Sequence, residues 1–330
     1  MAMWNNRLSF KHSFFQASPL LDSYDEEAGV VMSDEILHKP VMLQEVLSMC
    51  NLKPGMTVVD ATVGMGGHAA AIAKVVCPEG RLICMDKDEE SLSMARKNLE
   101  DFSDKCIFVQ SDFRNLDNAL TDQGVKGADV ILFDLGISSY QLDNPLRGFS
   151  IRGEGPLDMR MDRKGFICAY DLINNLNEDE IAAILWRFGQ ERFSHRIAHK
   201  LVLAREKAPI SSTKQLADIV LNVLPYKARF KKIHPATRTF QALRIAVNRE
   251  LDALDEALKK AGLILNKGGR ICVISFHSLE DRIVKVAFRD FVKTGEFALV
   301  FKKILKPSLE EMRSNPRSRS AKMRVIERIK

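Results

Sequence analysis

The chain has 330 residues, of which 46% are hydrophobic and 28% are charged, and its formal net charge is +6. This composition predicts a folded protein of one or two domains and excludes a largely disordered chain. No apolar run approaches the roughly 18–20 residues of a membrane-spanning helix, so we expect no membrane partner. The six cysteines are scattered without a CxxC pair, which predicts reduced thiols, no bound metal and a cytoplasmic location.

The N-terminal 32 residues differ from the rest of the chain. No acidic residue precedes Asp22, and the segment contains basic, serine and aromatic side chains, as organelle transit peptides do. Import into an organelle is therefore an alternative to a cytoplasmic location. We expect residues 1–32 to form a disordered extension that is dispensable for activity.

Short apolar, β-branched segments alternate with helical patterns along the chain. The predicted strands are 57–64, 81–86, 106–112, 128–136 and 270–276, with helices after Gly67, over 88–102 and over 115–121. This alternation predicts an α/β fold with a doubly wound, parallel sheet. Acids stand at or just past the ends of the first four strands, namely Asp60, Asp86, Asp112 and Asp134. Ligands bind at this edge in open α/β sheets.

About 130 residues separate the fourth and fifth predicted strands, far more than one crossover helix requires. Apolar residues at helical spacing in 177–207 and 212–224 predict an inserted, mostly helical domain. A further run, 236–261, places its apolar residues on one continuous stripe and leads back to the sheet. We therefore assign 33–140 and 237–330 to the core and 141–236 to an inserted substrate-recognition domain. Residues 297–305 and 322–329 are expected to pair as a closing antiparallel hairpin.

The stretch VVDATVGMGGH (58–68) is typical of a strand, a glycine-rich turn and the start of a helix. Asp86 lies 20 residues beyond Gly66, the spacing of a carboxylate that binds ribose hydroxyls. A GxGxxA dinucleotide pattern also fits, so a nicotinamide or flavin cofactor and a cofactor-free sheet remain alternatives. Asp60 would repel a pyrophosphate, whereas it would attract the ammonium and sulfonium groups of S-adenosylmethionine. Asp112 and Asp134 add negative charge at the same edge, so S-adenosylmethionine is favoured.

Histidines and basic clusters have less specific interpretations. His195 and His199 have the i,i+4 spacing of a metal pair but no third ligand nearby, so we expect a basic helix face. His277 directly follows the fifth predicted strand, where structural and functional roles are both open. Residues 302–330 contain ten Lys or Arg against three Glu, and 226–238 is a second basic cluster. Both would suit phosphate groups, although a solvated surface is the alternative.

Several blocks resemble a known family in order, from about His38 to Arg328. They include DATVGMGGH, DLGISSYQLD, GPLDMRMD, HPATRTFQALRIAVNREL, GGRICVISFHSLEDRIVK and NPRSRSAKMRVIER. They are similar to the bacterial 16S rRNA cytosine-N4 methyltransferase family (RsmH, also called MraW). The resemblance implies a class I S-adenosylmethionine-dependent methyltransferase with an inserted helical domain. Its substrate would be the exocyclic N4 of one cytosine in the decoding region of the small ribosomal subunit's 16S rRNA.

The resemblance also implies roles for individual residues. S-adenosylmethionine would be bound by seven residues, namely Gly66, Gly67, His68, Asp86, Phe113, Asp134 and Gln141. Many amino-methyltransferases carry an (N/D)PP(Y/F) motif after the fourth strand, whereas this chain has Asp-Leu-Gly-Ile and keeps only the acid. Cytosine N4 is a poor nucleophile, and an acceptor near its hydrogens helps it react.

Asp134 is therefore the first candidate for that acceptor, and Asp134 and His277 are the two candidate catalytic residues. Asp158, Arg160, Asp162 and His277 are candidates for clamping the base, with a salt-bridged hinge as the alternative. Two other functions remain open. The first is an S-adenosylmethionine-dependent methyltransferase with another nucleic-acid or protein substrate, and the second is a non-catalytic rRNA-binding assembly protein.

Overall fold

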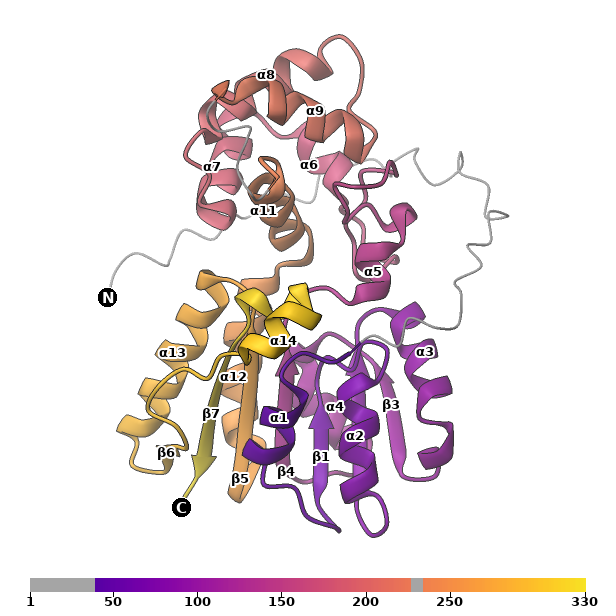
Figure 1. The fold of residues 1–330 in the computed structure, drawn as a ribbon, viewed down its shortest axis with the longest axis vertical. Coiled ribbons are helices and arrows are strands. Elements are labelled where there is room, and N and C mark those ends of the chain that lie inside the picture. Colours follow the sequence, from indigo (N-terminus) through magenta and orange to yellow (C-terminus); the bar gives the residue numbers. More distant parts are fainter. Residues whose placement is uncertain (1–38, 227–233) are drawn as a thin grey trace. The chain divides into compact units, whose positions relative to one another are not determined.

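The computed structural model describes residues 39–226 and 234–330, so the expected N-terminal extension lies outside the described residues. The described chain divides into two compact units (Figure 1). The sheet-bearing unit comprises 39–144, 161–163 and 248–330, and the inserted unit comprises 145–160 and 164–247. Among the described helices, none is both long and apolar enough to cross a bilayer.

The sheet-bearing unit contains, within the described residues, a seven-stranded sheet in the order β3-β2-β1-β4-β5-β7-β6. The strands β1 to β5 are parallel to their neighbours, whereas β7 is antiparallel to both β5 and β6. The strands are β1 (Thr57–Asp60), β2 (Arg81–Asp86), β3 (Cys106–Gln110), β4 (Ala128–Asp134), β5 (Leu265–Ser275), β6 (Phe297–Leu299) and β7 (Lys322–Arg328). The predicted doubly wound α/β fold is confirmed, and the β6–β7 pair confirms the closing hairpin.

Helices pack on both faces of this sheet (Figure 1). The first three helices contact one another in sequence, and α12 contacts both α4 and α13. The helices of this unit are α1 (Leu43–Met49), α2 (Gly67–Val76), α3 (Glu89–Asn98), α4 (Leu116–Asp122), α5 (Ser139–Asp143), α12 (Glu250–Ile264), α13 (Ser278–Lys293) and α14 (Leu309–Ser314). Short 3₁₀ turns lie at Glu100–Phe102, Phe113–Asn115 and Pro316–Ser320.

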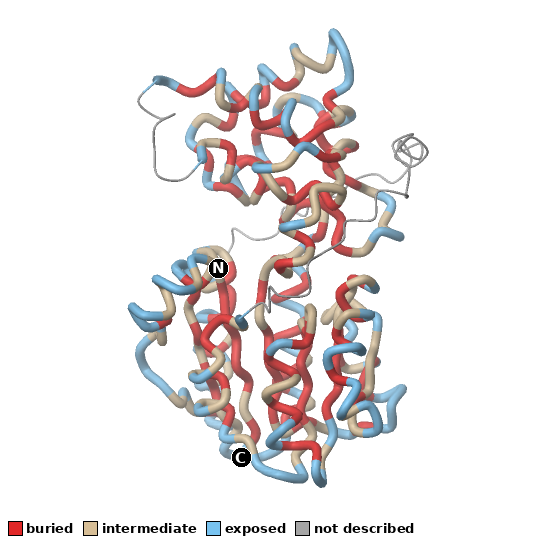
Figure 2. The backbone as a smooth tube through the Cα atoms, turned by 45° about the vertical axis from the view of Figure 1, so that its right-hand side comes forward, coloured by how far each residue is buried: buried red, intermediate tan, exposed pale blue. Residues whose placement is uncertain are grey.

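The core lies along the central strands. In β4, Val130, Ile131, Leu132 and Phe133 are fully buried, because a parallel strand covered on both faces has no solvated side. Figure 2 shows this burial as an almost continuous red path through the sheet. The six cysteines are all buried free thiols. Asp134 stands where this apolar strand ends, so the sheet itself fixes the position of the acid.

The inserted unit is helical. Its helices within the described residues are α6 (Ala169–Asn175), α7 (Glu178–Gly189), α8 (Ser194–Arg205), α9 (Thr213–Val223) and α11 (Thr237–Asn248), with a 3₁₀ turn at Pro145–Arg147. The predicted run 177–207 is divided into α7 and α8, because Gln190 adopts a left-handed conformation (φ 50°) that ends α7. A capping box between Asn177 and Glu180 starts α7. The second basic cluster, 226–238, lies mostly outside the described residues.

The sequence predicted one continuous helical segment over 236–261, and the structure interrupts it at one residue. Arg249 has a φ of 50°, a left-handed conformation in which an α-helix cannot continue. The apolar residues before it belong to the inserted unit and those after it to the sheet-bearing unit. Each helix buries its own stripe in a separate core, so one periodic pattern spans two elements. The inserted unit therefore extends to Val247, beyond the expected boundary at residue 236.

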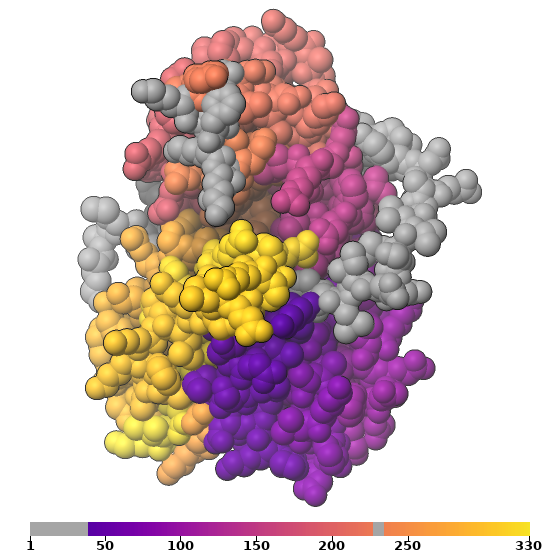
Figure 3. Space-filling model, in the orientation of Figure 1, coloured from indigo at the N-terminus to yellow at the C-terminus, as the bar shows by residue number. Residues whose placement is uncertain are grey.

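The C-terminal segment packs against the first described residues. The Glu311 carboxylate accepts a hydrogen bond from the Met42 backbone N–H at 2.7 Å, and the Asn315 amide donates to the Lys39 carbonyl at 3.1 Å. Figure 3 shows the yellow C-terminal segment beside the indigo start of the described chain. These contacts place α14 next to the residues that precede α1.

Candidate active site

The glycine-rich turn after β1 has a backbone that only glycine adopts readily. Gly64 and Gly66 have φ values of 52° and 87°, and Gly66 is the N-cap of α2 without a side-chain capping bond. A Cβ atom at Gly67 would lie 2.6 Å from Cγ of Pro40, so no larger residue fits there. The first N–H groups of α2 therefore have no side-chain acceptor from the cap, and they can bind a polar ligand.

Asp86, the last residue of β2, fixes this turn. Its Oδ2 accepts the Gly64 N–H and its Oδ1 accepts the Asp88 N–H, both at 2.9 Å. Burial raises the pKa of Asp86 to about 6, against the opposing effect of these two hydrogen bonds. Each carboxylate oxygen retains a second lone pair, so the group can still accept hydrogen bonds from ligand hydroxyls.

Asp60, His68 and Asp134 gather at the ends of β1 and β4 and the start of α2. Asp60 and His68 are 1% and 5% exposed. The His68 Nε2 atom lies 3.4 Å from Asp134 Oδ2, an ion-pair contact too long for a well-formed hydrogen bond. Within the described residues, both ring nitrogens of His68 and Oδ1 of Asp134 are buried without a hydrogen-bond partner. Such atoms are costly, and a bound ligand is a common source of the missing partners.

The electrostatics of this group favour a cationic ligand. Burial raises the pKa of Asp60 to about 7, although the charge of His68 and the Thr62 N–H oppose the shift. Burial lowers the pKa of His68, but the contact with Asp134 and the charges of Asp134 and Asp60 outweigh it and raise the pKa overall. Two acids beside a single imidazole leave the group short of positive charge, which an ammonium or sulfonium centre would supply.

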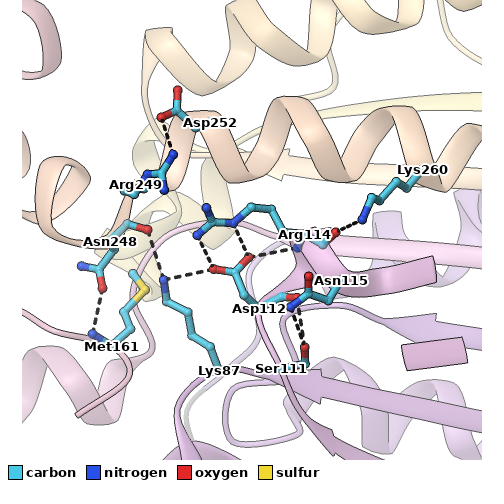
Figure 4. Close-up of polar contacts among 10 residues, drawn as sticks. All are labelled: Lys87, Ser111, Asp112, Arg114, Asn115, Met161, Asn248, Arg249, Asp252 and Lys260. Atoms are coloured by element: carbon cyan, nitrogen blue, oxygen red, sulfur yellow. Dashed lines mark hydrogen bonds and ion pairs between the residues drawn. The ribbon is translucent and has the colours of Figure 1, made fainter. Parts of the chain in front are cut away.

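Asp112 has a different role from the one expected. Its carboxylate lies 3.0 Å from Arg114 Nη2 and 3.7 Å from Lys87 Nζ (Figure 4). Burial raises the pKa of Asp112, but these two cations outweigh it and hold the pKa below its ordinary value. The carboxylate is therefore ionised and neutralised within the fold, and it does not add unpaired negative charge for a cationic ligand.

Phe113 and Gln141 lie on segments that follow β3 and β4. The Phe113 ring is half-buried and meets the Phe133 ring edge-on, with centroids 5.9 Å apart. The Gln141 side chain is buried, donates to Asp88 Oδ2 at 2.6 Å and accepts the Ser138 N–H at 3.0 Å. Its amide thus joins α5 to the start of α3, and contact with a cofactor stays a prediction for Gln141.

His277 is the N-cap of α13, directly after β5. Its Nδ1 accepts the Glu280 N–H at 3.4 Å, and its Nε2 lies 3.1 Å from Glu280 Oε1. Glu280 in turn accepts the N–H groups of Phe276 and His277. Ligand atoms of Glu250, His277 and Glu280 come within 4.8 Å of one another, but the capping box already uses the Glu280 carboxylate. His277 therefore has a clear structural role here.

Three of the other predicted side chains, Asp158, Arg160 and His199, are found in ion pairs. Arg160 and Asp158 form a double contact at 2.8 Å within the inserted unit, and Arg160 also donates to the Gly165 carbonyl at 2.7 Å. His199 Nδ1 lies 2.9 Å from Glu178 Oε2 on the exposed face between α8 and α7. Both arrangements are those of ordinary structural pairs.

Sequence reasoning missed the network around Asn248. The Asn248 side chain accepts the Met161 N–H at 2.9 Å, and its carbonyl accepts from Lys87 Nζ at 3.3 Å (Figure 4). These bonds connect Asn248 to Met161 and to Lys87, the residue that follows β2. The partners are far apart in sequence, so no local pattern could have indicated them.

The chain is similar to a known protein family along most of its length. The sequence pattern that defines the MraW methylase family matches residues 35–329. The chain is 45% identical over 307 residues to the ribosomal RNA small subunit methyltransferase H of Brevibacillus brevis, which covers 88% of this chain and 98% of that protein. It is 45% identical over 311 residues to the enzyme of the same name from Heliobacterium mobile, covering 89% and 100%.

Proposed function

The chain belongs to the MraW methylase family, and from this premise we propose that it methylates the exocyclic N4 of a cytosine in small-subunit ribosomal RNA. The observation that carries the proposal is the extent of the match, which covers the inserted unit as well as the sheet-bearing unit. Substrate choice resides in the parts of a methyltransferase outside the cofactor site. A relative that acted on another substrate would be expected to diverge there.

The site fits S-adenosylmethionine, the methyl donor of the family. When bound, this cofactor supplies an electrophilic methyl group on a sulfonium centre. The Gly66 N–H donates to the Val63 carbonyl at 2.8 Å and so shapes the glycine turn, which leaves the N–H groups of Gly67 and His68 for the cofactor. Asp86 offers carboxylate oxygens to the ribose hydroxyls. We propose that Phe113 flanks the adenine and that Gln141 borders the same site.

Asp134 is the proposed acceptor for the target amino group. Its backbone N–H donates to Thr62 Oγ1 at 2.7 Å, which fixes the end of β4, and its Oδ1 is buried with no partner among the described residues. A carboxylate near the N4 hydrogens helps the nitrogen to pyramidalise and can receive the surplus proton. His277 remains a candidate for clamping the base, because it follows β5 at the same edge of the sheet.

Basic and aromatic surfaces support an RNA substrate. In the sheet-bearing unit Lys302, Lys303 and Lys306 are exposed on the segment before α14. In the inserted unit Trp186 is 62% exposed at the end of α7, next to Arg187. Cations bind the phosphate backbone, and an exposed indole can stack on an unpaired base. We propose that both units hold the RNA of the small ribosomal subunit, in the cytoplasm, while the cytosine is unstacked.

The test uses small ribosomal subunits from a bacterial strain that lacks the modification. The protein is incubated with these subunits and isotope-labelled S-adenosylmethionine, and the nucleosides are analysed by mass spectrometry. Labelled N4-methylcytidine is the expected product. Label on another nucleoside, or on protein, would favour a different substrate for the same methyltransferase site. An absence of S-adenosylmethionine binding in calorimetry would favour a non-catalytic assembly protein.

A further inference from the structure

The contact between His68 and Asp134 is the least explained feature of the site. Five buried side-chain atoms of the described residues have no hydrogen-bond partner, and three of them belong to these two residues. His68 is the second residue of α2 and Asp134 the last of β4, so two separate elements bring the side chains together. The glycine turn sets the start of α2, and therefore also the position of the imidazole.

Asp134 is fixed in a way that distinguishes its two oxygens. Its backbone is bound to Thr62, and Oδ2 faces His68 Nε2 at 3.4 Å. The other oxygen, Oδ1, is buried and has no partner among the described residues. Oδ1 is therefore the atom of this carboxylate that can accept a hydrogen bond from an amine.

We propose that His68 is a positioning residue for methyl transfer: it holds Oδ2 of Asp134 so that Oδ1 receives the proton of the target amino group. The proposal rests on the proposed function, because it takes cytosine N4 as that group. The nitrogen lone pair forms a bond to the methyl carbon, and the electron pair of the broken C–S bond stays on sulfur. One N–H proton passes to Oδ1, and its bonding pair returns to nitrogen.

The charges around His68 support this role. The groups that act on its imidazole are Asp60 from β1, Asp134 from β4 and Glu311 from the α14 segment, and all three are acids. Together they outweigh the effect of burial and raise the pKa of His68. A protonated imidazole attracts Oδ2 of Asp134, 3.4 Å away, and so holds the orientation of that carboxylate. As pH rises through the pKa of His68 this attraction is lost, so the positioning weakens and the transfer rate should fall.

The first measurement tests the pairing without any turnover. The imidazole of His68 is titrated by NMR in the full-length protein, and its signal is identified by its loss in His68→Gln. We expect a pKa above the ordinary histidine value, and a lower pKa in Asp134→Asn. A His68 pKa that is the same in wild type and Asp134→Asn would overturn the proposal.

The second measurement separates positioning from cofactor binding. Single-turnover rates are measured with saturating S-adenosylmethionine and small subunits, and cofactor affinity is measured by calorimetry. His68→Gln keeps the backbone N–H that is assigned to the cofactor, so we expect it to change cofactor affinity less than about threefold. We expect the same variant to lower the rate roughly 10- to 100-fold and to lose the fall in rate at high pH. An unchanged rate would overturn the proposal, as would a loss of cofactor affinity that accounts for the whole rate effect.

A matched control and a second variant complete the design. His199→Gln removes a histidine–carboxylate contact, to Glu178 at 2.9 Å, on an exposed surface, and we expect it to change neither rate nor cofactor affinity. Thermal unfolding checks the fold of each variant, and His68→Asn replaces His68→Gln if the latter unfolds. Mass spectrometry of the wild-type product tests the proposed function separately. If the methylated atom is not cytosine N4, the rate ratio on the actual acceptor still tests the positioning of Asp134.

Discussion

Lys87 at the end of β2 lies 3.7 Å from the Asp112 carboxylate after β3, and the same Nζ donates to the Asn248 carbonyl at 3.3 Å. The Lys87 ammonium group therefore neutralises Asp112 at the carboxyl-terminal edge of the sheet. It also binds Asn248, the first residue of the last segment of the sheet-bearing unit. Arg114 contacts the same acid at 3.0 Å (Figure 4). The negative charge at this edge of the sheet is therefore concentrated at Asp60, Asp86 and Asp134.

Replacing Asp112 by Asn should destabilise the protein in a pH-dependent way. Arg114 and Lys87 hold the pKa of Asp112 below its ordinary 3.8, so its contribution is present above that pH and is lost as pH falls through the lower folded-state pKa. We expect a loss of about 1–3 kcal/mol at pH 7 in urea unfolding, shrinking below about pH 4. Asp290→Asn, which removes an exposed ion pair with Lys293, should change little. An equal loss at pH 7 and pH 3 would contradict this account.

Replacing Asp60 by Asn should have opposite effects on stability and cofactor binding. Burial raises the pKa of Asp60 from 3.8 to about 7, so the cofactor-free protein loses stability as pH rises between these values. Each pKa unit corresponds to about 1.4 kcal/mol, so the cost is on the order of 4 kcal/mol above pH 7. At pH 8 we expect Asp60→Asn to melt higher than wild type without cofactor, yet to bind S-adenosylmethionine more weakly. A lower melting temperature at pH 8 would argue against the buried charge as the cause.

Replacing Asp86 by Ala should weaken S-adenosylmethionine binding roughly 10- to 100-fold, the range for a lost hydrogen bond to a charged group. The variant loses the ribose acceptor and also releases the Gly64 and Asp88 N–H groups. Isothermal titration calorimetry is the measurement, with exposed Asp290→Ala as the control. Affinity within about twofold of wild type would show that the β2 end is not the ribose site.

Replacing Trp186 by Ala should weaken binding to small ribosomal subunits while leaving S-adenosylmethionine affinity unchanged. The indole is 62% exposed, and losing one stacked base costs about 1–3 kcal/mol, or roughly 5- to 100-fold in affinity. Leu263→Ala removes another exposed apolar side chain, 80% exposed on α12, and is the matched control. Equal effects of the two variants in filter binding would remove the case for an RNA contact at α7.

Neutralising Lys302 and Lys303 together should reduce the salt dependence of subunit binding. Both side chains are exposed, and each phosphate contact contributes a slope of about 0.7–0.9 in log affinity against log salt concentration. Affinity is measured between about 50 and 200 mM salt for wild type and the double Gln variant. Parallel salt plots would mean that neither lysine contacts phosphate. The double variant Lys259→Gln with Lys285→Gln, at exposed positions of α12 and α13, removes the same two charges and controls for net charge.

The sequence predicted the sheet well, because short apolar, β-branched segments between helical patterns can be recognised from neighbouring residues alone. β2 matches its predicted range, and the β6–β7 hairpin forms from the segments expected. The break at Arg249 could not be predicted, because the apolar stripe continues across it and no Gly or Pro marks it. Here the packing of two separate cores decides the backbone conformation, and that information is not in the local pattern.

The candidate site was likewise predictable where local sequence determines it, and not where it depends on packing between elements. Glycine spacing and the acids at strand ends predicted the turn and Asp86, since both follow from the order of elements along the chain. The partners of Asp112 and Gln141 were not predictable, because they depend on side chains brought from other elements. His68 was expected only as part of the glycine turn. Its contact with Asp134 depends on how α2 and β4 meet, which a linear sequence does not state.

The bond between Glu311 and Met42 has a consequence for synthesis of the chain. Glu311 also acts on the imidazole of His68, and β7 lies between β5 and β6 in the sheet. A translating ribosome releases these elements long after the glycine turn. A nascent chain that ends before α14 therefore lacks part of the surroundings of its own methyl-donor site. The site is complete only after α14 has been made.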